Sequence, residues 1–185
     1  MNTPSPTPQK TRKFRNVAAL VAAMSIGAVA GRGTVEQTKI GRAHAEFVIT
    51  RADGTVEKWS ADNVKTKVGI DKTFKNTYST SMDANGLNYI ACSNDSLTET
   101  VDSTTLSNEI TLNGLGRAQG TYAHTAGTGT ATISRTFTAS GAQSVQKCAL
   151  FDATSSGTMH HALGFTQRSL QNGDQLAVTF TITLS

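Results

Sequence analysis

The sequence predicts an all-β protein: an antiparallel β-sandwich, jelly-roll-like or immunoglobulin-like, with an extended N-terminal arm. Three observations lead to this fold class. Apolar and polar residues alternate strictly at the C-terminal end, short apolar runs follow one another at intervals of roughly 8 to 12 residues, and Gly or Asn marks the turns between them. The chain of 185 residues has room for one such body, at 46–185, behind an arm at 1–45.

The clearest strand of the body is its last one. Its apolar residues recur at every second position, with Ala or Thr between them, so one face of this strand is expected to lie in the core. The predicted core residues are Leu176, Val178, Phe180, Ile182 and Leu184. A shorter copy of the pattern runs through Ile133, Arg135 and Phe137.

The arm combines extended, basic and apolar stretches. All three prolines lie in its first eight residues, and the arm carries a net charge of +6, which leaves −2 on the body. A basic arm on a mildly acidic body favours an acidic partner. The arm residues predicted to bind a partner are Lys10, Arg12, Lys13, Arg15, Leu20, Val21, Met24, Ile26 and Val29.

The same arm also resembles a secretory signal peptide, because basic residues precede a short apolar run and Ala43-His44-Ala45 follows. We expect a retained arm instead, since this small-residue motif lies well beyond the apolar run. The run is shorter than the about 20 apolar residues of a membrane span, so no span is expected.

The body is expected to begin with a hairpin. The segments 47–52 and 55–59 flank Asp53-Gly54, the strongest hairpin signal in the chain, and Trp59 is expected in the core or at its edge. Residues 61–81 are read as a loop with one short helix, 87–92 as a strand, and 93–108 as an exposed loop. Further strands are expected within 117–124, 133–137, 145–151 and 159–165.

Several segments of the body together resemble a family of proteins. They are LNYIA from Leu87, DSTTLSNEI from Asp102, NGLGRAQGTYAHTAGT from Asn113, RTFTAS from Arg135, CALFDATSSGTMHHALGF from Cys148 and LQNGDQLAVTFTITLS from Leu170. In order and spacing they resemble small β-rich virion structural proteins of tailed double-stranded DNA viruses.

This resemblance covers most of residues 87–185 and implies a non-enzymatic component of the virion. The first expectation is a capsid decoration or minor capsid-associated protein that works as a homo-oligomer against other virion proteins. A tail, neck or surface-appendage component is the alternative. From another class, a secreted β-sandwich binding module or adhesin with a cleaved signal peptide stays open.

Catalytic and metal-binding patterns are weak in this sequence. His160 and His161 are neighbours and would point to opposite faces of a strand, which does not suit two ligands of one metal. A trio of His124 with Asp102 or Asp174 and a serine is expected by chance in a chain so rich in Ser and Asp. We expect no enzyme, cofactor or metal. The basic cluster includes Phe14 as its one aromatic residue, so sequence-specific nucleic-acid binding is not expected either.

The two cysteines, Cys92 and Cys148, fall in predicted strands beside apolar neighbours. Both a disulfide and two buried free thiols fit this setting, and the apolar neighbours favour free thiols. For Arg117 and Arg135, both inter-subunit ion pairs and simple exposure are open, while Asp152 and Asp174 are expected to cap turns.

Overall fold

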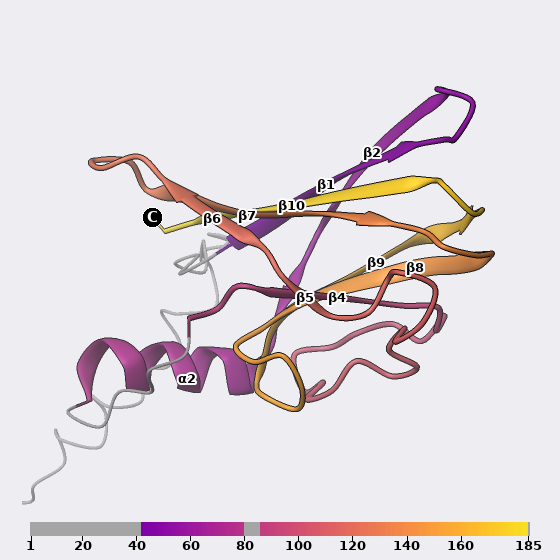
Figure 1. Cartoon of the computed structure of the whole chain (residues 1–185). Helices are drawn as coiled ribbons and strands as arrows, with labels where there is room; N and C mark the ends of the chain where they lie inside the picture. Colours follow the sequence, from indigo (N-terminus) through magenta and orange to yellow (C-terminus); the bar gives the residue numbers. More distant parts are fainter. Residues whose placement is uncertain (1–41, 80–85, 185) are drawn as a thin grey trace, which may run out of the picture. The chain divides into compact units, whose positions relative to one another are not determined.

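The all-β prediction is confirmed by the structure, a computed structural model that describes residues 42–79 and 86–184. Within these residues the chain forms two five-stranded antiparallel sheets and a 12-residue helix, α2 (Lys67–Tyr78). Figure 1 shows the sheets as two stacked layers, with α2 on the outer side of the second sheet. The predicted arm lies almost entirely outside the described residues.

The first sheet, sheet A, contains the N-terminal hairpin and the last strand. Its order is β2-β1-β10-β7-β6. The strands are β1 (Arg42–Thr50), β2 (Val56–Asp62), β6 (Thr121–His124), β7 (Thr130–Thr138) and β10 (Gln175–Thr183). Residues 42–45, assigned to the arm in the sequence analysis, are therefore part of β1, and Ala43 and Ala45 are buried.

The second sheet, sheet B, has the order β3-β9-β8-β4-β5. Its strands are β3 (Val64–Lys65), β4 (Tyr89–Ser93), β5 (Ala118–Gln119), β8 (Gln143–Phe151) and β9 (Met159–Leu170). Two of the expected strands differ from the prediction. The strand expected at 117–124 is divided into β5 of sheet B and β6 of sheet A, and the strand expected at 159–165 continues to Leu170 as β9.

The main core lies between the sheets, and β10 contributes to it as predicted. Leu176, Val178 and Phe180 are fully buried, and Ile182 is partly buried. Burying each such side chain stabilises the fold by roughly 1.5 to 3 kcal/mol before conformational entropy is subtracted. Leu184 corrects the prediction: it lies beyond the end of β10 and is 61% exposed.

The predicted hairpin joins β1 to β2. Arg51 N–H donates to Thr55 O at 2.8 Å, and Gly54 takes a φ of +86°, a conformation that glycine adopts without steric cost. Trp59 stacks on Phe47 with ring centres 5.0 Å apart, and Phe165 of β9 contacts both rings. Trp59 is therefore a core-edge aromatic residue that links the two sheets.

The predicted short helix, α2, packs on β9. Thr66 caps it, because its Oγ1 accepts from Gly69 N–H at 3.1 Å and donates to the Met159 carbonyl. Gly69 lies against the backbone of β9, where an added Cβ would stand 2.6 Å from the His160 Cα. Among the described residues, no helix is long and apolar enough to cross a bilayer.

Candidate functional site

The outer face of sheet B is covered by a third layer, formed by α2 and most of the long segment 94–117. Two residues of that segment, Ile110 and Leu115, belong instead to the main core. A second apolar cluster lies under this layer and holds Ala91, Leu106, Ala149, Phe151, Met159 and Ala162. The segment 93–108 was expected to be an exposed loop. Ser93 instead ends β4 and is fully buried, 94–108 is a loop, and Leu106 within that loop is buried in this cluster.

Lys147 belongs to this outer face because of a β-bulge. Val145 and Lys147 are two residues apart, so a regular strand would place them on the same side. The register of β8 against β9 shifts between them, because two steps along β8 face four steps along β9, from Arg168 to Gly164. Across this irregularity Lys147 lies away from the core that contains Val145. Lys147 then shares the outer face with Ala149 and Phe151.

The ammonium group of Lys147 is buried against two carboxylates. Its Nζ donates to Glu99 Oε1 at 2.9 Å and lies 3.7 Å from Asp95 Oδ2. The side chains of Lys147, Asp95 and Glu99 are 2%, 9% and 8% exposed. A buried charge is tolerated only with partners of this kind, so the cluster fixes the segment 95–99 onto sheet B. We call these three residues the Lys147 cluster.

The two oxygens of Asp95 have different surroundings. Oδ1 accepts from Leu97 N–H at 3.0 Å, whereas Oδ2 is buried without a hydrogen-bond donor and faces Lys147. The loop is held in this position by Ser93, whose Oγ accepts from Asp95 N–H at 3.0 Å and donates to the Ser107 carbonyl. The Asp95 carboxyl group is therefore fixed in orientation.

A surface cavity of about 420 Å³ opens beside the Lys147 cluster. Its lining combines the loop 95–99 with β8 and β9, and Asp62, Val64 and Phe165 complete it. The lining holds three carboxylates, those of Asp62, Asp95 and Glu99, and one ammonium group, that of Lys147, so its net charge is negative. Asp62 pairs with His44 and is 94% exposed, whereas Asp95 and Glu99 face Lys147. Nevertheless, no group of His, Cys, Asp and Glu side chains in residues 42–79 and 86–184 has the arrangement of a metal site.

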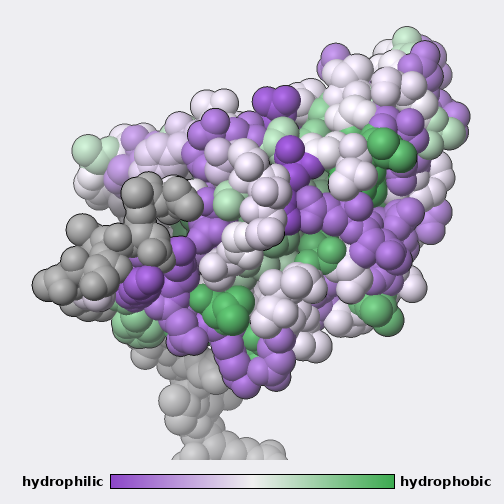
Figure 2. All heavy atoms as spheres, turned by 60° about the horizontal axis from the view of Figure 1, so that its bottom comes forward, coloured by the Kyte–Doolittle hydropathy of each residue, from purple (hydrophilic) through white to green (hydrophobic). Residues whose placement is uncertain are grey.

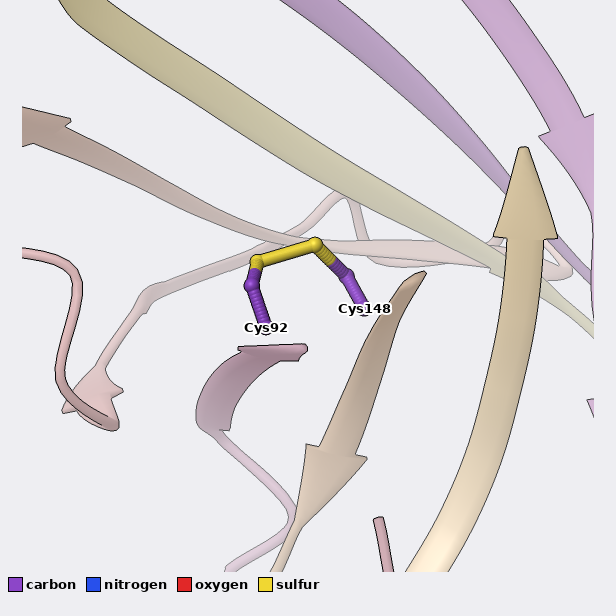
Figure 3. The surroundings of a disulfide bond; sticks show 2 residues. All are labelled: Cys92 and Cys148. Carbon is purple, nitrogen blue, oxygen red and sulfur yellow. A yellow bond between two sulfur atoms is a disulfide. The ribbon is translucent and has the colours of Figure 1, made fainter. Parts of the chain in front are cut away.

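Cys92 and Cys148 form a disulfide in the main core, on the inner face of sheet B (Figure 3). They are direct cross-strand partners in β4 and β8, with Cα atoms 4.1 Å apart, and both are fully buried. The interpretation as free thiols is therefore corrected, while the strand assignment and the burial are confirmed. The bond joins the same two strands that flank the Lys147 cluster, since Ser93 pairs with Lys147.

A second buried polar cluster lies under α2. His160 and His161 are 4% and 2% exposed in β9, and burial lowers their pKa to about 4 and about 3. Neither ring nitrogen of His160 has a hydrogen-bond partner, while His161 Nδ1 bonds with the side-chain amide of Asn63. Both imidazoles are accordingly neutral at pH 7.

The other residues singled out from the sequence do not meet at one place. His124 is exposed on β6 and bonds to the Thr130 carbonyl, Asp102 pairs with Lys67 at the start of α2, and Asp174 binds Arg51. The trio of His124 with Asp102 or Asp174 is thus not assembled. The nine predicted partner-binding residues of the arm, from Lys10 to Val29, lie outside the described residues.

The two predicted turn caps have further roles. Asp174 accepts from Gln171 N–H and Ala52 N–H and pairs with Arg51 at 2.8 Å, so it joins the turn before β10 to the β1–β2 hairpin. Its pKa is lowered, first by the Gln171 hydrogen bond. Asp152 accepts from Thr158 N–H at 2.7 Å and pairs with Lys72 of α2 at 2.9 Å.

The two arginines proposed for inter-subunit contacts differ. Arg117 is buried inside the outer layer, where its guanidinium bonds Glu109 twice and the carbonyls of Ala153 and Ser156. Its side chain is 8% exposed and unavailable to a neighbour, so the inter-subunit interpretation is wrong for Arg117. Arg135 is exposed on β7 and bonds to the Gln119 carbonyl.

Sequence reasoning missed the Lys147 cluster. One signal pointed to it: Lys147 directly precedes the apolar run 148–151, and a charged side chain that turns into the protein there requires a counter-ion. Its carboxylate partners come from a loop about fifty residues earlier, and that pairing has no local pattern.

Three comparisons with known proteins add no relative. No protein-family model matches the chain, and neither the curated proteins nor the solved structures contain a match.

Proposed function

We propose that this protein is a structural component of a virus particle, a capsid decoration or minor capsid-associated protein that stabilises the particle through subunit contacts. In this role it forms homo-oligomers on the particle and works by surface complementarity, without substrate turnover. Two kinds of support exist: the resemblance of the segments in 87–185 to virion proteins of tailed viruses, and a sandwich body suited to presenting surfaces.

The observation that carries this proposal is that a disulfide and ion pairs cross-link the body internally. A buried disulfide joins β4 to β8, and the buried ion pair Lys147–Glu99 fixes the outer layer to sheet B. Two partly buried pairs add to it: Lys72–Asp152 joins α2 to the turn after β8, and Arg117–Glu109 joins two parts of the segment 94–117. Disulfides persist in oxidising surroundings outside the cytosol. Such a body suits a particle component that must keep its shape after release from a cell.

The outer layer also supplies a candidate contact surface. Seven large apolar side chains are exposed among the described residues, and four of them belong to this layer. They are Phe74, Leu97, Val101 and Leu112, which are 46% to 71% exposed. Figure 2, which brings this side of the molecule forward, shows separate hydrophobic spots among hydrophilic residues. Separate spots of this kind suit contacts made on a lattice with many copies.

The arm provides the second part of the proposed mechanism. Its basic residues, Lys10 to Arg15, would meet acidic groups of a neighbouring subunit, and its apolar residues, Leu20 to Val29, would bury against that subunit.

The test is to purify particles by density gradient from a culture that carries this gene and to identify the proteins they contain. We expect full-length chain in a fixed ratio to the major capsid protein, and its position on the reconstructed particle separates a head site from a tail or neck site. Recovery only as a free secreted protein that lacks most of residues 1–45 would contradict the proposal and support the secreted binding module.

A further inference from the structure

The Lys147 cluster brings an amine, a carboxyl carbon and a base into one buried place. Lys147 Nζ lies 3.7 Å from Asp95 Oδ2, and it donates a hydrogen bond of 2.9 Å to Glu99 Oε1. Two carboxylates around a single ammonium group exceed what charge balance requires. The second one, Asp95, leaves Oδ2 without a donor in a buried position.

We propose that Lys147 and Asp95 condense into an intramolecular amide, with Glu99 as the group that transfers the protons. The amide would link β8 covalently to the loop that follows β4. This inference concerns the body alone and holds whether or not the chain is part of a virion.

Each atom of the reaction has a position in the structure. Glu99 removes one proton from the Lys147 ammonium group and passes it to Asp95 Oδ2, which leaves a neutral amine and a neutral carboxyl group. The amine nitrogen attacks the Asp95 Cγ, and a new C–N bond forms. A second proton from Nζ travels through Glu99 to Oδ2, the C–Oδ2 bond breaks, and one water molecule leaves. The amide keeps the third proton, and Glu99 returns to its carboxylate form.

The hydrogen bonds of Asp95 suit this reaction. The Leu97 N–H donates to Oδ1 at 3.0 Å, so it can stabilise the negative charge that Oδ1 carries in the tetrahedral intermediate. The same oxygen becomes the amide carbonyl oxygen. The other oxygen, Oδ2, accepts no hydrogen bond that would have to break before it leaves as water. It faces the Lys147 amine, from which its protons come.

Burial provides the driving force. Amines and carboxylic acids do not condense readily in water, where both are charged and solvated. Here the side chains are at most 9% exposed and held in contact, which replaces a bimolecular encounter by an intramolecular one. Condensation also converts two of the three buried charges into one neutral amide, which removes their desolvation penalty, and the remaining carboxylate of Glu99 lines the cavity. The adjoining cavity gives the released water an exit.

The direct test is mass spectrometry of the purified full-length chain after reduction and alkylation. We expect an intact mass lower by one water molecule than the sequence requires. Trypsin should not cut at Lys147, and it should release a branched peptide in which 76–117 is joined to 136–168. A free peptide 136–147 together with the full mass would overturn the proposal. Loss of water without the branched peptide would also overturn it, because a cyclic imide at an aspartate loses the same mass.

Two variants test the roles of the residues. Glu99→Gln keeps the size of the side chain and removes the base, so we expect the full mass and normal cleavage at Lys147. The matched control is Asp152→Asn, which removes a carboxylate from the other buried lysine pair, Lys72–Asp152. That variant should still show the loss of water and the branched peptide. A branched peptide in the Glu99→Gln variant would show that Glu99 is not the proton carrier.

Discussion

The guanidinium carbon of Arg117 lies 3.6 Å from the centre of the Phe151 ring. The same guanidinium donates to both carboxylate oxygens of Glu109, so one side chain joins the loop 94–117 to β8 and to the turn that follows it. Stacking on an aromatic ring together with a two-point bond to a carboxylate is an arrangement that arginine makes and lysine does not.

Replacing Arg117 should therefore destabilise the outer layer. Arg117→Met keeps the apolar stem but leaves Glu109 without its partner, and breaking such a buried pair costs about 3 kcal/mol. The measurement is urea denaturation followed by fluorescence of Trp59. Arg135→Met is the matched control, because Arg135 is exposed and its loss should change the free energy of unfolding by less than about 0.5 kcal/mol. Equal effects of the two substitutions would contradict this assignment.

The disulfide and the proposed amide close almost the same loop, and this makes their effects non-additive. Closing a loop between positions 56 residues apart contributes about 4 kcal/mol in the loop-entropy model. Replacing Cys92 and Cys148 together by Ala should therefore cost about 4 kcal/mol in the Glu99→Gln background, where no amide forms. In the otherwise unchanged chain the same replacement should cost far less. Equal losses of unfolding free energy in both backgrounds would argue against the amide.

Gly69 should not tolerate a side chain, although alanine is the better helix former. The added Cβ would stand 2.6 Å from the His160 Cα, which is backbone and cannot rotate away. We expect Gly69→Ala to lower the free energy of unfolding by about 2 kcal/mol through overpacking between α2 and β9. Gly86→Ala is the control, because a Cβ there meets no atom within 4 Å. A stabilised Gly69→Ala protein would show that α2 does not pack this closely.

Acid should destabilise the body through the buried histidines. Burial lowers the pKa of His160 to about 4 and of His161 to about 3, from an ordinary value of 6.5. The unfolded chain then binds more protons than the folded one below pH 6.5. Stability should thus be at its plateau above pH 6.5 and fall as the pH drops through 6.5 towards 4 and then 3. In a His160→Asn, His161→Asn double variant, denaturation curves measured across this range should show a weaker decline. An unchanged decline would assign the acid sensitivity to other groups.

Much of the fold follows from local patterns in the sequence. The alternation from Leu176 to Phe180 identifies β10 and its buried face, and Asp53-Gly54 identifies the hairpin, because side-chain periodicity and turn chemistry act over a few residues. The error at Leu184 has a simple cause: the apolar pattern continues for one step beyond the last paired residue of β10.

Apart from the charge of Lys147 beside an apolar run, local patterns do not predict the candidate site. A register shift between β8 and β9 decides which face Lys147 occupies, and the pairing of β4 with β8 decides that Cys92 meets Cys148. Both depend on contacts between segments far apart in the chain, and a single sequence shows no local sign of them. Arg117 is a similar case, because its burial depends on the loop that covers it.

The most direct test of the proposed function compares full-length chain with a variant that lacks residues 1–41, each supplied to particles produced without this protein. We predict that the full-length chain is recovered on gradient-purified particles and restores their resistance to heat. The shortened chain should fold, as judged by its disulfide and its circular dichroism, but stay off the particles. Equal recovery of both chains on the particles would contradict attachment through the arm, and recovery of neither would contradict a structural role in the virion.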